Sequence, residues 1–176
     1  SFNVELNFVP PDLSALDALQ SEVLVGNIWQ DKRPCDGIAS LYDWRSANRL
    51  SQLMKSAYVT GQLGEVLLIP GRKRMSFDKI LLFGLGPSDD FDNVRFETVT
   101  RAMVRTLDEL CAAQVVIELP GRQANRIEPE AAASKLLEIV GESPAPREWT
   151  LVEEATSKKR IEKYLLERRH NVRRLD

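Results

Sequence analysis

The chain has 176 residues, of which 43% are hydrophobic and 28% are charged, and its formal net charge is -2. This length suits one domain with a sizeable core, and this composition is typical of folded rather than disordered proteins. No apolar run approaches the roughly 18 residues that a membrane-spanning helix needs, and the first ten residues lack the layout of a signal peptide. We therefore expect a soluble, cytoplasmic protein with no membrane partner.

Six segments have the patterns of β-strands. Residues Phe2–Val9 alternate apolar and polar side chains, which predicts a half-buried strand at a sheet edge that ends at Pro10. Most of the other segments are continuously apolar, a pattern typical of strands that are buried on both faces. These segments are Val23–Trp29, Gly64–Ile69, Lys79–Phe83, Gln114–Leu119 and the weaker Glu148–Val152.

Helical patterns lie between these strands. The clearest covers Asn93–Cys111, where apolar residues recur every three or four positions and Asp92 stands where an N-cap would. Similar patterns predict helices over Trp44–Ala57 and Glu128–Val140, with a loop over Asp31–Ser40. Because parallel strands need long crossovers that helices supply, the order predicts an α/β fold. We expect a three-layer sandwich, with a mixed, mostly parallel sheet of about six strands and helices on both faces.

The end of the chain is basic. We expect residues 1–154 to form the α/β domain and residues 155–176 to form a helix, and residues 158–176 carry eight Lys and Arg against three Asp and Glu. Contact with nucleic acid is one interpretation, and a solvated helix face is the other. The candidate nucleic-acid-binding residues are Lys158, Lys159, Arg160, Lys163, Arg168, Arg169, Arg173 and Arg174.

The sequence offers few groups for catalysis. His170 is the single histidine and lies in the predicted basic helix at the end of the chain, which leaves no Ser–His–Asp or Cys–His pairing with plausible placement and no two-histidine metal site. Cys35 and Cys111 have no metal-ligand or redox spacing, and we expect free thiols. We predict no catalytic residue, no metal ligand and no cofactor in this chain.

Strand-end loops are the places to expect a ligand, because ligands of open α/β sheets bind at the carboxyl ends of strands. The segment Gly84–Asp90 follows a predicted strand and leads to the clearest helix, so its backbone N–H groups could converge on an anion, although it also suits a plain tight turn. Basic side chains in the other loops could form one electropositive rim or serve only solubility. They are Lys32, Arg33, Arg72, Lys73, Arg74 and Arg122.

Three local features resemble the N-terminal domain of leucyl (cytosol) aminopeptidases. They are Asp43-Trp44-Arg45 at the start of a helix, the turn Gly61–Glu65 entering an apolar strand, and the strand Leu81–Gly86 ending in Gly-Leu-Gly. The resemblance covers roughly residues 2–153 and implies a macro-domain-like α/β domain. In the full enzymes this domain is joined to a C-terminal domain that holds two metal ions, whose metal-binding motifs have no counterpart in these 176 residues.

The resemblance implies a non-catalytic domain with an oligomerisation, regulatory or ligand-binding role. Its expected partner is a second copy or another protein domain, because N-terminal domains of this family help to set hexamer contacts. An alternative is a nucleotide or ADP-ribose module, since macro domains bind ADP-ribose at strand-end loops. The candidate ligand-binding residues are Asp36, Gly37, Ile38, Gly84, Gly86 and Ser88.

Overall fold

The computed structural model describes residues 4–175, with side chains up to Arg168 in the last helix. The strands are β1 (Leu6–Val9), β2 (Ser21–Trp29), β3 (Val66–Pro70), β4 (Phe77–Gly86), β5 (Gln114–Ile117) and β6 (Glu148–Val152). The helices are α1 (Leu13–Ala18), α2 (Gly37–Arg45), α3 (Arg49–Lys55), α4 (Asn93–Glu109), α5 (Pro129–Glu142) and α6 (Ala155–Leu175), with a short 3-10 turn over Ser88–Asp90.

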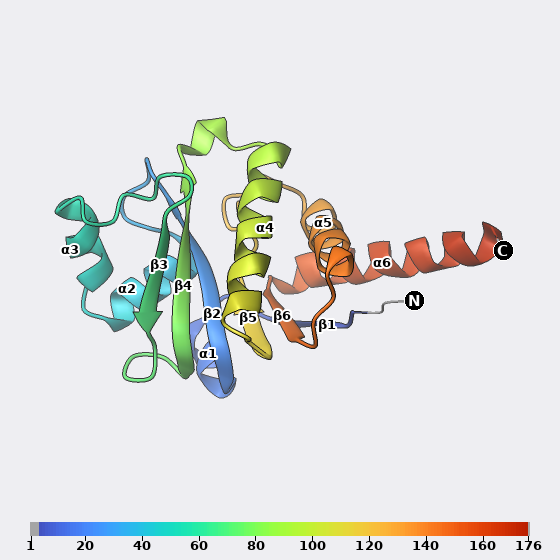
Figure 1. Ribbon diagram of the computed structural model, residues 1–176, viewed down its shortest axis with the longest axis horizontal. Coiled ribbons are helices and arrows are strands. Elements are labelled where there is room, and N and C mark those ends of the chain that lie inside the picture. Colours follow the sequence, from blue (N-terminus) through green and yellow to red (C-terminus); the bar gives the residue numbers. More distant parts are fainter. Residues whose placement is uncertain (1–3, 176) are drawn as a thin grey trace.

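The strands form one six-stranded sheet in the order β1-β6-β5-β2-β4-β3. Every neighbouring pair is parallel except β3 and β4, which form an antiparallel hairpin. The carboxyl ends of β2, β4 and β5 therefore lie together at one end of the strands. This end of the sheet is at the top of Figure 1 and is called the upper edge below. The predicted mixed, mostly parallel sheet is confirmed.

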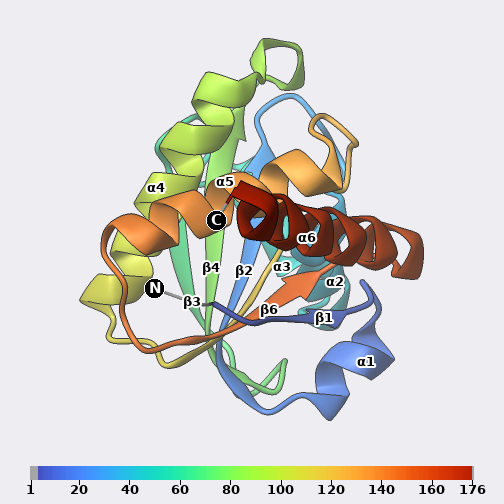
Figure 2. The ribbon, with the colours of Figure 1, turned by 90° about the vertical axis from the view of Figure 1, so that its right-hand side faces the viewer.

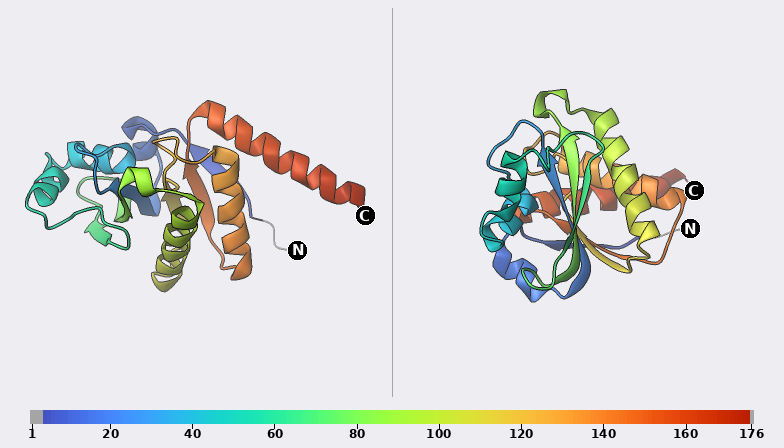
Figure 3. Two further views of the ribbon diagram at one scale, coloured as in Figure 1. Left: turned by 90° about the horizontal axis from the view of Figure 1, so that it is seen from above. Right: turned by 60° about the vertical axis from the view of Figure 1, so that its left-hand side comes forward.

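Helices cover both faces of the sheet, as predicted (Figures 2 and 3). Alternate side chains of the central strands point to opposite faces because the strand repeat is two residues. Leu81 and Phe83 belong to the core beneath α4, α5 and α6, whereas Ile80 and Leu82 belong to the core beneath α1, α2 and α3. No helix in the described part of the chain is long and apolar enough to cross a membrane.

The long helix α4 follows its prediction closely. Phe96, Val99 and Met103 are buried against the sheet, and the Asp92 carboxylate accepts a hydrogen bond of 2.9 Å from the Arg95 amide, which caps the helix. Cys35 and Cys111 are free thiols, also as predicted.

The predicted helix over Trp44–Ala57 is wrong in its bounds, because two shorter helices replace it. Helix α2 starts at Gly37, inside the predicted loop, and ends at Arg45. Ala47 and Asn48 then have φ angles of 56° and 67°, which interrupt the helix. The Asp43 carboxylate accepts a 2.9 Å hydrogen bond from the Ser51 amide and so stabilises the first turn of α3.

The two edge strands also differ from their predictions. Strand β1 lies at the sheet edge as predicted but starts at Leu6, and Phe2 is outside the described residues. The prediction that Gly64–Ile69 is buried on both faces is wrong, because β3 is the opposite edge strand. Val66 and Leu68 are 44% and 52% exposed.

Candidate functional site

The loops that follow β2 and β4 lie together at the upper edge of the sheet. The Gln30 amide donates to the Gly86 carbonyl at 3.0 Å, and the Ser88 amide and hydroxyl donate to the two carboxylate oxygens of Asp31 at 3.0 and 2.9 Å. These bonds hold the pKa of Asp31 below its ordinary value. The predicted residues Gly86 and Ser88 therefore lie at this edge, in contact with the loop after β2.

The two glycines at the carboxyl end of β4, Gly84 and Gly86, contact a turn of the same chain. The amides of Gly84 and Gly86 donate to the carbonyls of Glu65 and Gly61 at 2.8 and 2.9 Å. A Cβ atom on Gly84 would lie 2.0 Å from the Gln62 carbonyl oxygen. Close approach of the turn thus requires glycine at this position, and both N–H groups are already bonded within the protein.

A buried carboxyl group lies at the amino end of α2. Glu118, just after β5, is 3% exposed, and its Oε2 accepts a 2.7 Å hydrogen bond from the Ile38 amide. Its Oε1 accepts a second bond of 3.3 Å from the Asn27 side-chain amide, which also donates to the Glu118 carbonyl at 2.7 Å. The N-cap residue of α2, Asp36, forms no side-chain cap bond. Glu118, which follows the neighbouring strand β5, therefore caps the amino end of α2.

This contact depends on glycine at position 37. Gly37 has a φ angle of 60°, and a Cβ atom there would lie 2.2 Å from Glu118 Oε2. Burial raises the pKa of Glu118 to about 8; hydrogen bonds from Ile38 and Asn27 lower it and the nearby Asp36 raises it. The candidate residues Asp36, Gly37 and Ile38 thus surround a side chain of the protein itself.

Sequence reasoning missed Glu118. The residue was included in the predicted strand Gln114–Leu119 without a role. The signal that could have found it is one carboxylate at the end of an otherwise apolar strand, since buried charged side chains need partners.

The predicted basic rim does not form, because its residues lie at different places. The Arg122 and Glu153 side chains are 6% and 4% exposed and form a bidentate ion pair with bonds of 3.0 and 2.9 Å. Arg33 donates to the Trp29 and Thr60 carbonyls at 3.0 and 3.1 Å. Residues 72–74 lie at the other end of the strands, away from the upper edge, because they follow β3, which runs antiparallel to its neighbour.

Two buried polar atoms at the upper edge have no hydrogen-bond partner among the described residues. They are the indole nitrogen of Trp29, at the end of β2, and Oε1 of Gln123, in the loop after β5. The Trp29 ring packs edge-on against Phe91 at 5.2 Å, and the Gln123 amide donates to Asp36 at 3.3 Å. These two atoms are a free donor and a free acceptor near the candidate ligand-binding residues.

The described basic residues of α6 are partly engaged with the domain. Arg160 pairs with Glu128, the N-cap residue of α5, and with Glu130 in the first turn of α5, and Arg168 donates to the Ser134 hydroxyl at 2.7 Å. Lys158 lies over the Phe8 ring, whereas Lys159 and Lys163 are exposed. The side chains of Arg169, Arg173 and Arg174 lie outside the described residues, and nucleic-acid binding stays a prediction.

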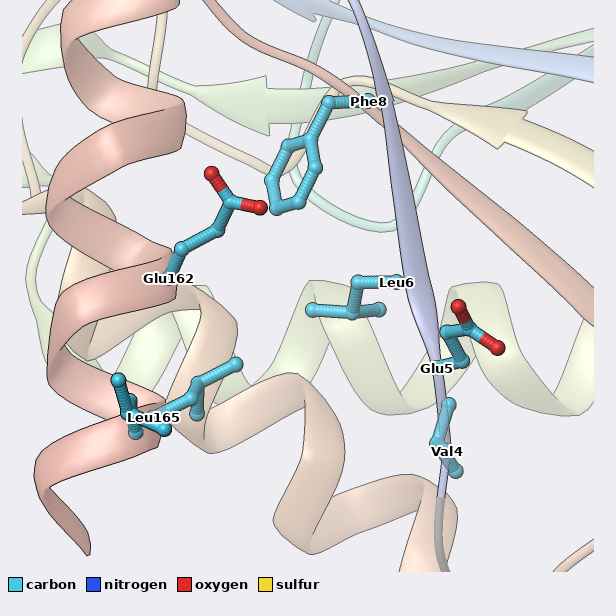
Figure 4. Close-up of a pocket in the computed structure, with 7 residues that line it drawn as sticks. Val4, Glu5, Leu6, Phe8, Glu162 and Leu165 are labelled. Carbon is cyan, nitrogen blue, oxygen red and sulfur yellow. The ribbon is translucent and has the colours of Figure 1, made fainter.

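A groove of about 490 Å³ separates β1 from α6 (Figure 4). Leu6, Phe8 and Leu165 line it, as do Glu5 and Glu162. Within the part of the chain that the structure describes, no three His, Cys, Asp or Glu side chains come together as a metal site would require.

The sequence of this chain is similar to that of one known protein family. The sequence profile of the cytosol aminopeptidase family, N-terminal domain, matches residues 26–143. A probable cytosol aminopeptidase of Stutzerimonas stutzeri is 26% identical over 105 residues, which cover 60% of this chain and 21% of that protein. The chain spans about a fifth of the length of the curated relatives it matches.

Solved structures share the fold at low sequence identity. A mutant of tomato leucine aminopeptidase matches with a TM-score of 0.61 and 14% identity, over 93% of this chain and 36% of that one. A Trypanosoma brucei macrodomain in complex with ADP matches with a TM-score of 0.66 and 15% identity, over 91% of this chain and 67% of that one.

The family profile covers more than half of the chain, and the sheet order and helix layers are those of a macrodomain-like fold. The chain belongs to the cytosol aminopeptidase family, of which it contains the N-terminal domain.

Proposed function

We propose that this domain is a non-catalytic protein-interaction domain, with an assembly or regulatory role in a protein of the cytosol aminopeptidase type. The observation that carries the proposal is the Glu118 carboxyl group, which occupies the amino end of α2 at the upper edge of the sheet. The curated relatives, named as probable cytosol aminopeptidases, support a cytosolic location as part of the proposal.

Occupancy by Glu118 weakens the case for a nucleotide at this edge. A helix amino end binds a phosphate through its free N–H groups, and the Ile38 amide is already bonded to Glu118. The amides of Gly84, Gly86 and Ser88 are bonded to Glu65, Gly61 and Asp31. A phosphate would have to displace these internal bonds, and Glu118 would have to leave a buried position.

Calorimetry tests this proposal. Titration of the chain with ADP and with ADP-ribose at neutral pH should give no saturable heat, and the metal-loaded chain should not hydrolyse leucine p-nitroanilide. Saturable nucleotide binding, or hydrolysis above the level of a heat-denatured control, would refute the non-catalytic interaction role.

A nucleotide-like ligand is the second candidate function. The buried Trp29 indole nitrogen and Gln123 Oε1 favour it, because buried polar atoms are usually hydrogen-bonded and these two could bond a ligand at the upper edge. The ADP complex of the T. brucei macrodomain supplies the chemical class. Under this alternative, Trp29→Phe would remove the free donor while keeping the aromatic packing, and it would weaken the heat of ADP binding.

A further inference from the structure

Two carboxyl groups are placed to accept a hydrogen bond from the first turn of α2. One belongs to Glu118, whose Oε2 accepts the Ile38 amide hydrogen at 2.7 Å. The other belongs to Asp36, the N-cap residue, and an N-cap side chain ordinarily accepts from the second or third amide of its helix. Because Gly37 is the first residue of α2, Ile38 supplies the second amide. Both carboxyl groups therefore share one natural donor.

The backbone of Asp36 already has a capping conformation. Its φ and ψ angles are -120° and 178°, in the extended region typical of N-cap residues, and aspartate is among the residues preferred there. Asp12 and Asp92 cap α1 and α4 in this way, with bonds of 2.7 and 2.9 Å. The Asp36 side chain instead accepts a 3.3 Å hydrogen bond from the Gln123 amide and lies 3.9 Å from the Lys32 ammonium group. A residue from another part of the fold thus fills the position that Asp36 would fill.

The surroundings of Glu118 suit a neutral carboxyl group. The residue is 3% exposed, and its second donor is the uncharged Asn27 amide at 3.3 Å. No ion pair among the described side chains includes Glu118, and Arg122 in the loop after β5 is bonded to Glu153. Burial raises the pKa of Glu118 to about 8, with a contribution from the negative charge of Asp36. A carboxylate buried without a cation is costly, so ionisation disfavours this position.

We propose that the first turn of α2 is a pH-sensitive switch, in which Glu118 holds the Ile38 amide while it is protonated and Asp36 takes that amide when Glu118 ionises and turns out of the interior. A carboxylate at Asp36 suits the cap because the amino end of a helix stabilises negative charge. The exchange frees Gln123 from Asp36, so it also alters the loop after β5. This inference goes beyond the interaction role and holds whichever partner the domain binds.

The switch responds to pH in one direction. Glu118 binds its proton more tightly in the first form, where its pKa is about 8, than in the second form, where it is exposed and near its ordinary value of 4.5. Raising the pH therefore favours the second form, by up to roughly tenfold per pH unit between these two values, and the effect levels off above them. The form capped by Glu118 predominates at acidic and neutral pH, and the form capped by Asp36 gains population at alkaline pH.

Carbon-detected NMR of the intact chain between about pH 5 and pH 10 tests the switch. The side-chain carboxyl carbon of Glu118 and the side-chain amide carbon of Gln123 should move together, with a common midpoint well above the ordinary glutamate value of 4.5. Asp36→Asn and Asp36→Ala form a matched pair, because both remove the negative charge and only Asn can still accept the Ile38 amide hydrogen. The Glu118 midpoint should be about one pH unit higher in Asp36→Ala than in Asp36→Asn, because alanine cannot stabilise the second form.

Equal Glu118 midpoints in the two variants would overturn the switch, because Glu118 would then ionise without a replacement cap. A Glu118 signal that titrates near 4.5 or not at all would also overturn it, as would a Gln123 signal that does not follow Glu118. Circular dichroism should show both variants folded, since the Asp36 side chain is 38% exposed. Nucleotide binding by the parent chain would refute the interaction role and leave the two midpoints unchanged, so the two proposals fail through different observations.

Discussion

The Glu118 carboxyl group lies where a bound anion would lie in a ligand site. It accepts the Ile38 amide hydrogen at the start of α2, and Gly37 has no side chain to displace it. A helix amino end supplies N–H donors and a positive partial charge, so a side-chain oxygen is a natural occupant. We interpret this group of residues as a structural contact that caps α2.

Replacing Glu118 with Gln should change how stability depends on pH. The pKa of Glu118 is about 8 in the folded protein and near its ordinary value of 4.5 in the unfolded chain. Between these values the folded state binds the extra proton, so the parent chain should lose stability as pH rises from about 5 to 8. Gln keeps an acceptor for Ile38 and cannot ionise.

Urea unfolding of both proteins at acidic and alkaline pH measures this effect. The free energy of unfolding of the variant, relative to the parent, should increase by about 3–5 kcal/mol between about pH 5 and pH 9, at roughly 1.4 kcal/mol per pKa unit. A difference that stays constant with pH would show that the carboxyl group is not held protonated.

At the residue scale, the sequence indicated the upper edge of the sheet, but it did not indicate the contact between Ile38 and Glu118. Gly37 and Ile38 are candidates because the family resemblance implies a macro-domain-like fold, in which strand-end loops bind ligands, and they do lie near the carboxyl ends of the strands. Their partner Glu118 is 80 positions away along the chain. Strand periodicity does not show which side chain of β5 meets which helix, so this pair was not predictable without the fold.

Among the elements, the loop after β5 is fixed by the buried Arg122–Glu153 pair. Arg122 also donates to the Ile127 carbonyl at 2.8 Å and to the Ser157 hydroxyl at 3.2 Å, which connects the loop to the first turn of α6. Because Glu153 directly follows β6, one arginine joins the loop after β5, the end of β6 and the start of α6.

Arg122→Met should destabilise the domain by about 3–5 kcal/mol, because it leaves the Glu153 carboxylate buried without its partner. Arg126→Met is the matched control: Arg126 pairs at 3.5 Å with Asp89, whose side chain is 91% exposed, and such surface pairs contribute about 1 kcal/mol or less. Urea unfolding of both variants gives the comparison. Equal losses would contradict a special role for the buried pair.

The elements were predictable in kind and order, but not in all their bounds or positions. Apolar repeats located α4 and the central strands, because those patterns reflect burial against the sheet. The break between α2 and α3 depends on the backbone at Ala47 and Asn48, for which the apolar pattern gives no sign. Strand β3 resembles a buried strand in sequence, and its edge position follows only from the antiparallel hairpin.

At the scale of the whole molecule, the alternation of strands and helices determined the α/β fold. That fold is shared with a tomato aminopeptidase and with macrodomains at about 15% identity or less, so the layers persist while most of the sequence differs. Because one fold supports many functions, the function has to be argued from the site. Here the site contains Glu118, and the outer strand β3 offers an apolar edge.

The most direct test of the account is an NMR titration of the chain with ADP at neutral pH, following the amide signals of Ile38, Gly84, Gly86 and Ser88. These four signals should stay in place, because the N–H groups are bonded to Glu118, Glu65, Gly61 and Asp31. Saturable shifts confined to these amides would contradict it and would establish the upper edge of the sheet as a nucleotide site.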